Sequence, residues 1–271
     1  MKGRSWLLLW GCLWIGAAAP AADKPPAPVV EALYPSGDRV PANHLKFYIH
    51  FSVPMRQGVF SDYCKLLKEN GEPVLEPFRE TELWSEDGRR LTLWLHPGRQ
   101  KKGVNLNTDF GPILSPELRY KLVIDGAWPS ADGVASGKNT EKTFTATARA
   151  TKQLDANDWK IQPPAAGSRL PLEIRFPSAL DHALLMRCLR VAAKDGSPVA
   201  GEVSTAASEC CWRFMPAQPW AAQAHQVMVD TILEDLAGNS LARPFEVDLS
   251  RPAPPKMPDT LALSFTPVPG G

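Results

Sequence analysis

The sequence predicts an all-β protein made of two tandem β-sandwiches, and three observations support this prediction. Apolar residues occupy every second position from Leu45 to Phe51, which is the pattern of a strand with one buried face. The same alternation returns from Leu170 to Phe176, and each run ends at a proline. The chain also holds 27 prolines in 271 residues, which favours short strands joined by turns over helices.

The amino-terminal segment has the three parts of a secretory signal. Lys2 and Arg4 supply positive charge, residues 6–15 are apolar, and the small residues 17–22 offer a cleavage site. Cys12 lies in a sequence similar to a lipoprotein box, so lipidation is one alternative and retention as an uncleaved anchor is another. No later stretch approaches the ~18 apolar residues that a membrane span needs. The mature protein is therefore expected outside the cytoplasm, in the periplasm, on the cell surface or secreted.

The charge balance limits the classes of partner. Lys and Arg number 30 and Asp and Glu number 29, so the net charge is close to zero. A chain without a broad basic field is not expected to bind nucleic acid or an anionic membrane.

Short strands are expected throughout the first half of the chain. Asn70-Gly71 is a strong hairpin signal, because a type I′ turn needs positive φ at both central residues. About seven strands with turns every ~8–12 residues are typical of an immunoglobulin-like sandwich. Six of the expected strands are Val29–Tyr34, Leu45–Phe51, Tyr63–Leu67, Arg90–Leu95, Tyr120–Asp125 and Lys142–Thr147.

An internal repeat indicates two copies of this unit. The hairpin 70–74 returns as 195–199 at an offset of 125, and 124–133 returns as 229–238 at an offset of about 105. The first copy therefore carries an insertion of some twenty residues, expected around 99–114. Units of this size can each bury a core, so they form tandem domains. The expected divisions are a signal peptide (1–22), a Pro-rich linker (23–30), two immunoglobulin-like domains (31–148 and 149–250) and a Pro-rich tail (251–271), in which 261–265 is either a stray strand or extended chain.

The order of motifs in the first copy resembles a known family. Tyr-Pro-x-x-Gly at 34–38 is followed by Phe-Ser-x-Pro-Met at 51–55, Asn-Gly-x-Pro-Val at 70–74 and Tyr-x-Leu-x-Ile-Asp at 120–125. This order resembles the bacterial Ig-like domain of the type found in S-layer proteins. The resemblance covers 31–148 and is weaker over 149–250, where the Ser-x-Pro-Met ending is absent. It implies a spacer or binding module of secreted and surface proteins.

Four cysteines follow the signal segment. In an oxidising compartment Cys188 is expected to pair with Cys210 or Cys211 within the second sandwich. Cys64 is not the equivalent of Cys188, because its distance to the following glycine differs by one residue, and such a slip reverses the face of a strand. Buried free thiols are the alternative, because connectivity cannot be read from sequence.

Two other chemistries deserve comparison with a plain binding module. His44, His50 and Met55 carry copper-ligand groups, although His50 is expected on the solvent-facing side of its strand. Small periplasmic copper carriers have a similar fold, but their ligand motifs do not carry over to this chain. A glycosidase needs two carboxylates held across a cleft, and the acidic residues between Glu80 and Asp87 are expected in an exposed turn.

Aromatic and basic residues supply the candidate binding surface. Trp84 could stack on a sugar, because an aromatic ring offers an apolar platform, whereas most other tryptophans are expected in the cores. A local basic group formed by Arg89, Arg90, Arg99, Lys101 and Lys102 could meet an acidic glycan or partner. The leading expectation is a non-catalytic protein that needs no cofactor and binds an envelope protein or polysaccharide or acts as a spacer. A periplasmic copper carrier comes second and a carbohydrate-active enzyme third.

Overall fold

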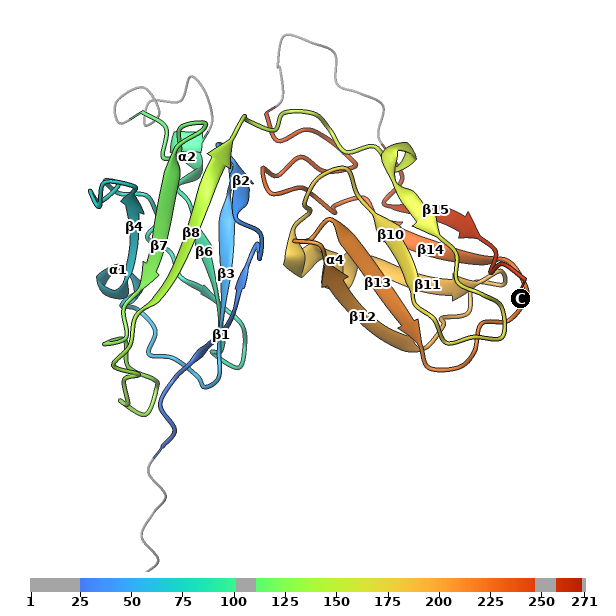
Figure 1. Ribbon diagram of the computed structural model, residues 1–271, viewed down its shortest axis with the longest axis horizontal. Coiled ribbons are helices and arrows are strands. Elements are labelled where there is room, and N and C mark those ends of the chain that lie inside the picture. Colours follow the sequence, from blue (N-terminus) through green and yellow to red (C-terminus); the bar gives the residue numbers. More distant parts are fainter. Residues whose placement is uncertain (1–24, 101–110, 247–256, 270–271) are drawn as a thin grey trace, which may run out of the picture.

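The computed structural model describes residues 25–100, 111–246 and 257–269. The described chain forms two all-β bodies side by side, each made of two facing sheets (Figure 1). The first sandwich contains β1 (Val30–Tyr34), β2 (Arg39–Pro41), β3 (Lys46–Phe51), β4 (Cys64–Lys68), β5 (Leu83–Trp84), β6 (Arg90–Trp94), β7 (Arg119–Ile124), β8 (Thr140–Thr147) and the short helices α1 (Phe60–Tyr63) and α2 (Pro97–Gln100). The predicted fold class of two tandem sandwiches is confirmed. The predicted signal peptide lies outside the described residues.

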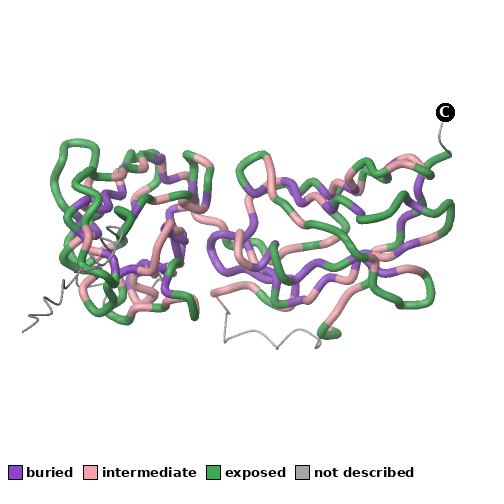
Figure 2. The backbone as a smooth tube through the Cα atoms, turned by 90° about the horizontal axis from the view of Figure 1, so that it is seen from below, coloured by how far each residue is buried: buried purple, intermediate pink, exposed green. Residues whose placement is uncertain are grey.

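The second sandwich repeats this plan. It contains β9 (Lys160–Gln162), β10 (Leu172–Arg175), β11 (Leu189–Ala193), β12 (Gly201–Ala206), β13 (Cys211–Pro216), β14 (His225–Asp230) and β15 (Thr260–Phe265), with the 3₁₀ turn η1 (Ala156–Asp158) and the helix α4 (His182–Cys188). The sheet order β1-β3-β6-β5 corresponds to β9-β10-β13-β12, and β4-β7-β8 corresponds to β11-β14-β15. Buried residues run along the inside of each body and also lie at the junction between them (Figure 2).

Backbone hydrogen bonds confirm the repeat at the predicted offset of 125. The amide of Lys68 donates to Glu72, and the amide of Ala193 donates to Ser197, each at 2.8 Å. Gly71 and Gly196 both have positive φ (84° and 85°). Asn70 does not have positive φ, so the predicted type I′ turn is wrong. The hairpin loop is one residue longer than that turn, and Gly71 is its single left-handed residue.

The predicted insertion also falls where expected. The connection between β6 and β7 spans 95–118, whereas its counterpart between β13 and β14 spans 217–224. Residues 101–110 of this connection lie outside the described residues.

The expected Pro-rich tail 251–271 is in part a strand of the second sandwich. β15 pairs with β14 in antiparallel register from His225↔Phe265 to Asp230↔Thr260. A parallel bridge between Ala165 and Val268 then repeats the parallel pairing of β2 with β8. The second sandwich therefore extends past the expected boundary at residue 250. The connection between β14 and β15 spans 231–259 and is longer than its counterpart between β7 and β8, which spans 125–139.

Candidate functional site

The candidate functional site is the interface between the two sandwiches on the outward face of β3. Side chains alternate along a strand, so Phe47 and Ile49 enter the core of the first sandwich while Lys46, Tyr48 and His50 project the other way. Lys46 and Tyr48 are nevertheless only 9% and 6% exposed. The second sandwich covers this polar face, and His50 is half-buried rather than exposed on the solvent side as predicted.

A buried ion cluster lies at the centre of the interface. The Lys46 ammonium lies 2.6 Å from the Glu234 carboxylate and 3.0 Å from that of Asp181. The Tyr48 hydroxyl donates to the Asp181 carboxylate at 2.8 Å. Asp181 also caps the short helix α4, because it accepts a hydrogen bond from the amide of Leu184. One carboxylate therefore serves both a local helix and two side chains of the other sandwich.

The protonation states follow from this packing. Burial alone lowers the pKa of Lys46, but the carboxylates of Asp181 and Glu234 outweigh burial and raise that pKa above its ordinary value. Burial and the Asp181 carboxylate raise the pKa of Tyr48. The lysine thus stays charged and the phenol stays neutral, as a salt bridge and a donated hydrogen bond require.

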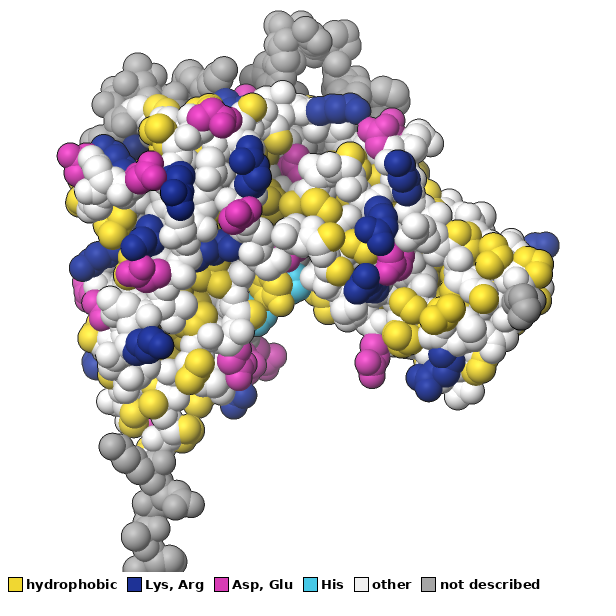
Figure 3. All heavy atoms as spheres, in the orientation of Figure 1, with side chains coloured by type: hydrophobic (Ala, Val, Ile, Leu, Met, Phe, Trp, Pro, Cys, Tyr) yellow, Lys and Arg dark blue, Asp and Glu magenta, His cyan; other side chains and the backbone are white. Residues whose placement is uncertain are grey.

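Histidine and tyrosine rings fill one end of the interface. The rings of Tyr34 and His182 stack with their centroids 3.4 Å apart, and His50 meets Tyr34 edge-on at 5.5 Å. Histidine atoms are visible at the base of the notch between the two bodies (Figure 3). Burial, followed by the charges of His50 and Arg90, lowers the pKa of His182 to about 4. Burial, followed by Arg90, also lowers the pKa of His50.

An apolar residue of the second sandwich enters the core of the first. Leu236, 7% exposed, belongs to the core cluster of the first sandwich, and its carbonyl accepts from the amide of Leu45 at 3.0 Å. The same carbonyl contacts Nδ1 of the fully buried His44 at 3.2 Å, so Nδ1 carries the proton and donates. Burial lowers the pKa of His44 to about 3 and keeps the ring neutral.

The linker between the sandwiches is held by two buried asparagines. Asn43 of the first sandwich exchanges two hydrogen bonds with the backbone of Ala150, at 2.7 and 2.9 Å. Asn239 of the second sandwich donates to the same Ala150 carbonyl at 3.0 Å. A linker fixed from both sides gives the domains little freedom to rotate.

The hairpin between β12 and β13 forms a further contact with the first sandwich. Ala207, Ser208 and Glu209 all have positive φ, between 50° and 63°, which is unfavourable for residues with a Cβ. The buried Glu209 carboxylate accepts from the amide and hydroxyl of Ser36 at 2.8 and 2.7 Å. These contacts with the other sandwich offset the local strain.

We expect Gly37→Ala to weaken the docking of the two sandwiches. A Cβ at Gly37 would lie 2.8 Å from Cβ of Ser208, which is closer than packed side chains approach each other. Overpacking of this kind costs about 1–3 kcal/mol, which a lowered thermal unfolding midpoint would reveal. Ser208→Gly in the same chain removes the clashing atom and should restore the midpoint. A double variant no more stable than Gly37→Ala would contradict this contact.

Two residues of the predicted binding surface, Trp84 and Arg99, both make contacts within the first sandwich. Trp84 is half-buried against Phe51 and Trp128, and its indole donates to Glu82 at 2.6 Å, so it is not a free sugar platform. Arg99 is 5% exposed, and its guanidinium donates to the backbone carbonyls of Leu75, Glu76 and Gly111. Lys101 and Lys102 lie outside the described residues.

Because Arg99 joins the connection after α2 to the segment 75–76, Arg99→Ala should destabilise the first sandwich. Hydrogen bonds to a charged group contribute about 1.5–3 kcal/mol each, so we expect a loss of roughly 2 kcal/mol or more in chemical denaturation. Arg89→Ala, at an exposed position of the same predicted basic group, should change stability by less than about 0.5 kcal/mol. Equal effects would show that Arg99 has no structural role.

The predicted disulfide is not formed in the structure. Cys64, Cys188, Cys210 and Cys211 are free thiols. Cys188 lies in the core of the second sandwich, whereas Cys211 alternates with the core residue Trp212 and projects away from that core. Cys64 begins β4 while Leu189 begins β11, so the expected non-equivalence of Cys64 and Cys188 is confirmed.

The copper-ligand groups do not converge. His44 and His50 lie six positions apart along one extended segment, which is about 20 Å, and Met55 belongs to the core. Within the described ranges, no group of three or more His, Cys, Asp or Glu side chains is placed to hold a metal ion.

Of the acidic residues between Glu80 and Asp87, the half-buried Glu82 precedes β5 and bonds to the segment 58–60, whereas Asp87 lies in the turn between β5 and β6. Burial raises the pKa of Glu82, but hydrogen bonds from the amides of Gly58 and Phe60 and the indole of Trp84 outweigh it and lower that pKa. Asp87 accepts from Ser85 and the amide of Arg89 within one turn.

The fold and interface define a tandem β-sandwich protein with a closely packed junction. In the part of the chain that is described, no helix is long and apolar enough to cross a membrane. No protein-family model and no curated protein matches this chain.

Several solved structures align with it at low similarity. Domains 1–6 of the surface-layer protein SbsC match with 12% identity and a TM-score of 0.32, over 74% of this chain and 23% of that one. Domains MG0, NIE and MG1 of α2-macroglobulin from Escherichia coli match with 12% identity and a TM-score of 0.30, over 89% of this chain and 71% of that one. Rst D1-D2 matches with 8% identity and a TM-score of 0.25, over 90% and 100%. At these TM-scores the alignments support no conclusion about the fold or the function of this chain.

Proposed function

We propose that this protein is a non-catalytic module of the cell envelope, whose two sandwiches act as one rigid unit that spaces or presents a bound protein or polysaccharide. The observation that supports this proposal is the polar interface. Lys46 and Asp181 are buried between the domains, and the partly exposed Glu234 completes the ion cluster with Lys46. Contacts between domains of one chain are by default loose enough to allow relative motion. This interface contains, besides the ion cluster, Leu236 in the core of the other sandwich and a linker bonded at Ala150 to both domains.

The extracytoplasmic location is part of the proposal and rests on the signal-like residues 1–22. The resemblance of the motifs at 34–55 and 70–74 to bacterial Ig-like domains of the S-layer type supports the same assignment. A copper carrier is not proposed, since His44, His50 and Met55 lie apart.

Affinity capture from a bacterial envelope fraction tests this function. The purified protein should retain a defined envelope protein or polysaccharide, and the cell-derived chain should begin near Asp23 when its amino terminus is sequenced. Hydrolysis of envelope polysaccharide by the purified protein, lost on substitution of a carboxylate, would contradict a non-catalytic role. Recovery of the full-length chain from the cytoplasm would contradict the location.

A further inference from the structure

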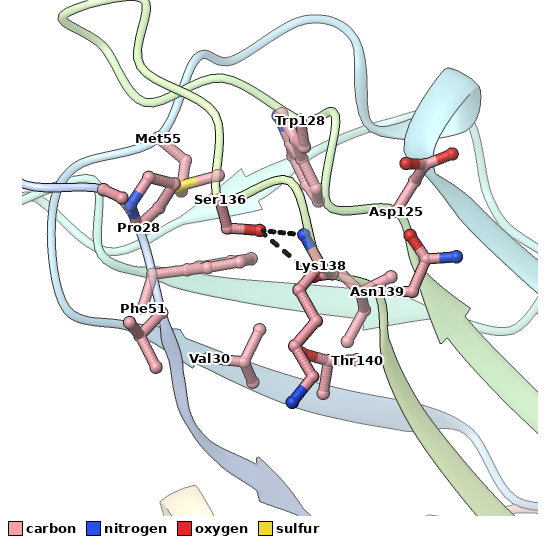
Figure 4. Close-up of a pocket in the computed structure, with 13 residues that line it drawn as sticks. Pro28, Val30, Phe51, Met55, Asp125, Trp128, Ser136, Lys138, Asn139 and Thr140 are labelled. Atoms are coloured by element: carbon pink, nitrogen blue, oxygen red, sulfur yellow. Dashed lines mark hydrogen bonds between the residues drawn. The ribbon is translucent and has the colours of Figure 1, made fainter.

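A cavity of about 340 Å³ opens at the seam of the first sandwich, between the segment entering β1 and the start of β8. β2 pairs with β8 only at Thr145–Thr147, the end of that strand. The first half of β8 therefore has no neighbouring strand on the side that faces β2. Four buried core residues line the cavity: Phe51, Met55, Ile124 and Trp128. Three of them, Phe51, Met55 and Trp128, are labelled in Figure 4.

Both walls of the cavity are fixed by hydrogen bonds. On one side, the amide of Val29 donates to the Ser52 hydroxyl and the amide of Ser52 donates to the Val29 carbonyl, each at 2.9 Å. On the other side, the amide of Gly126 donates to the Asn139 side chain at 2.9 Å. A Cβ at Gly126 would lie 2.2 Å from the backbone nitrogen of Lys138, so Gly126 packs directly on the backbone of Lys138. Such a cavity is preformed, as small-molecule sites usually are.

One cation lies at the mouth. Among the described residues, Lys138 forms no ion pair, and its ammonium ends near Val30 and Thr140 (Figure 4). The Asp125 carboxylate points away from this ammonium and accepts from the amide of Ala127 at 2.9 Å. The mouth therefore carries local positive charge beside an apolar floor.

The corresponding seam of the second sandwich provides a contrast. A cavity of about 600 Å³ lies between 152–157 and β15. Its lysine, Lys152, is already paired with Asp158 at 2.9 Å. The combination of an apolar floor with an unpaired cation therefore distinguishes the first seam.

We propose that the seam cavity of the first sandwich binds a small anionic amphiphile, with its apolar chain over Met55 and Trp128 and its carboxylate or phosphate against Lys138. An apolar chain gains free energy from burial in a preformed pocket. The anionic head adds a charge-assisted contact with Lys138 and fixes the orientation of the chain.

Nuclear magnetic resonance titration of the purified protein tests this site, with decanoate and decyl phosphate as probes below their micellar concentrations. The two probes distinguish a carboxylate from a phosphate head. Either should shift the Trp128 indole and Met55 methyl signals, while decyltrimethylammonium should bind roughly tenfold more weakly or not at all.

Two exposed charge reversals decide the role of the lysine. Lys138→Glu should weaken decanoate binding by roughly tenfold, whereas Lys65→Glu, an exposed lysine on β4 of the same sandwich, should leave it unchanged. Val30→Phe should fill the cavity and abolish the shifts. Unchanged Trp128 and Met55 signals, equal binding of the cationic probe, or equal effects of the two reversals would each overturn the proposal.

Discussion

Asp181→Ala should separate the two sandwiches. The substitution leaves the Lys46 ammonium with one carboxylate, at Glu234, and leaves the Tyr48 hydroxyl without its acceptor in a region almost closed to water. Removal of one partner from a buried ion pair costs about 3–5 kcal/mol. Small-angle X-ray scattering should therefore show a larger radius of gyration and a broader distribution of domain separations.

A matched variant separates docking from helix capping, because Asp181 also caps α4. Asp155→Ala removes a side-chain cap from the exposed turn η1 in the same sandwich, away from the interface. We expect it to cost about 1 kcal/mol and to leave the scattering profile unchanged. Unaltered scattering from Asp181→Ala would show that the ion cluster does not hold the domains.

Acidification should also open the interface, over a range set by the buried histidines. The pKa of His44 is lowered to about 3 and that of His182 to about 4, chiefly by burial. An undocked histidine titrates near 6.5, so the docked state binds fewer protons. Docking therefore retains its full stability above pH ~6.5 and loses it as the pH falls toward the lowered values. The loss is up to about 1.4 kcal/mol per pH unit for the fully buried His44 and smaller for the partly exposed His182, whose charge water screens.

Other charges around these rings modify the effect without reversing it. Lys46 and Lys142 act against protonation of His44, while Asp181 favours protonation of His182. Burial raises the pKa of Asp235, so protonation of this carboxyl stabilises docking in acid and opposes part of the histidine effect.

Scattering measured from pH 7.5 to 4 checks this acid opening. The double variant His44→Asn/His182→Gln should lose most of the pH dependence, and His96→Asn, outside the interface, should retain it. A wild-type profile constant over this range would contradict the role of the histidines.

The sequence predicts each sandwich better than it predicts their junction. Alternation from Leu45 to Phe51 identifies the core face of β3, but the opposite face is polar whether water or another domain covers it. Lys46 and Tyr48 are buried because complementary acids, Asp181 and Glu234, arrive from residues more than 130 positions later. A pattern within one strand contains no information about such a partner.

One signal in the repeat could have revealed the junction. The turn 130–133 of the first copy corresponds to 235–238 of the second, with matching bonds from Gly133 to residue 130 and from Gly238 to residue 235. The first copy carries the exposed Ala131-Asp132, whereas the second carries the buried Leu236-Ala237. An apolar pair in the turn of one copy, where the other copy has an exposed Asp, indicates that another part of the protein covers that turn.

The other errors have separate physical causes. Arg99 belongs to a group of basic residues typical of a solvated loop, yet free backbone carbonyls nearby provide its guanidinium with acceptors. The sequence predicts a tail where β15 lies, because the Pro-rich stretch 251–258 separates this strand from the rest of its sandwich. The disulfide prediction rests on an oxidising compartment and on cysteines placed in one sandwich, but Cys188 lies in the core while strand alternation turns Cys211 away from it.

Electron spin resonance between one label on each sandwich tests the central claim of a rigid pair. Labels attached through noncanonical amino acids at exposed Lys65 and Lys160 leave the cysteines intact. At pH 7.5 the account predicts a single narrow distance distribution that broadens in Asp181→Ala. A broad distribution in the wild-type protein would contradict it, because the interface would then fail to fix the two domains.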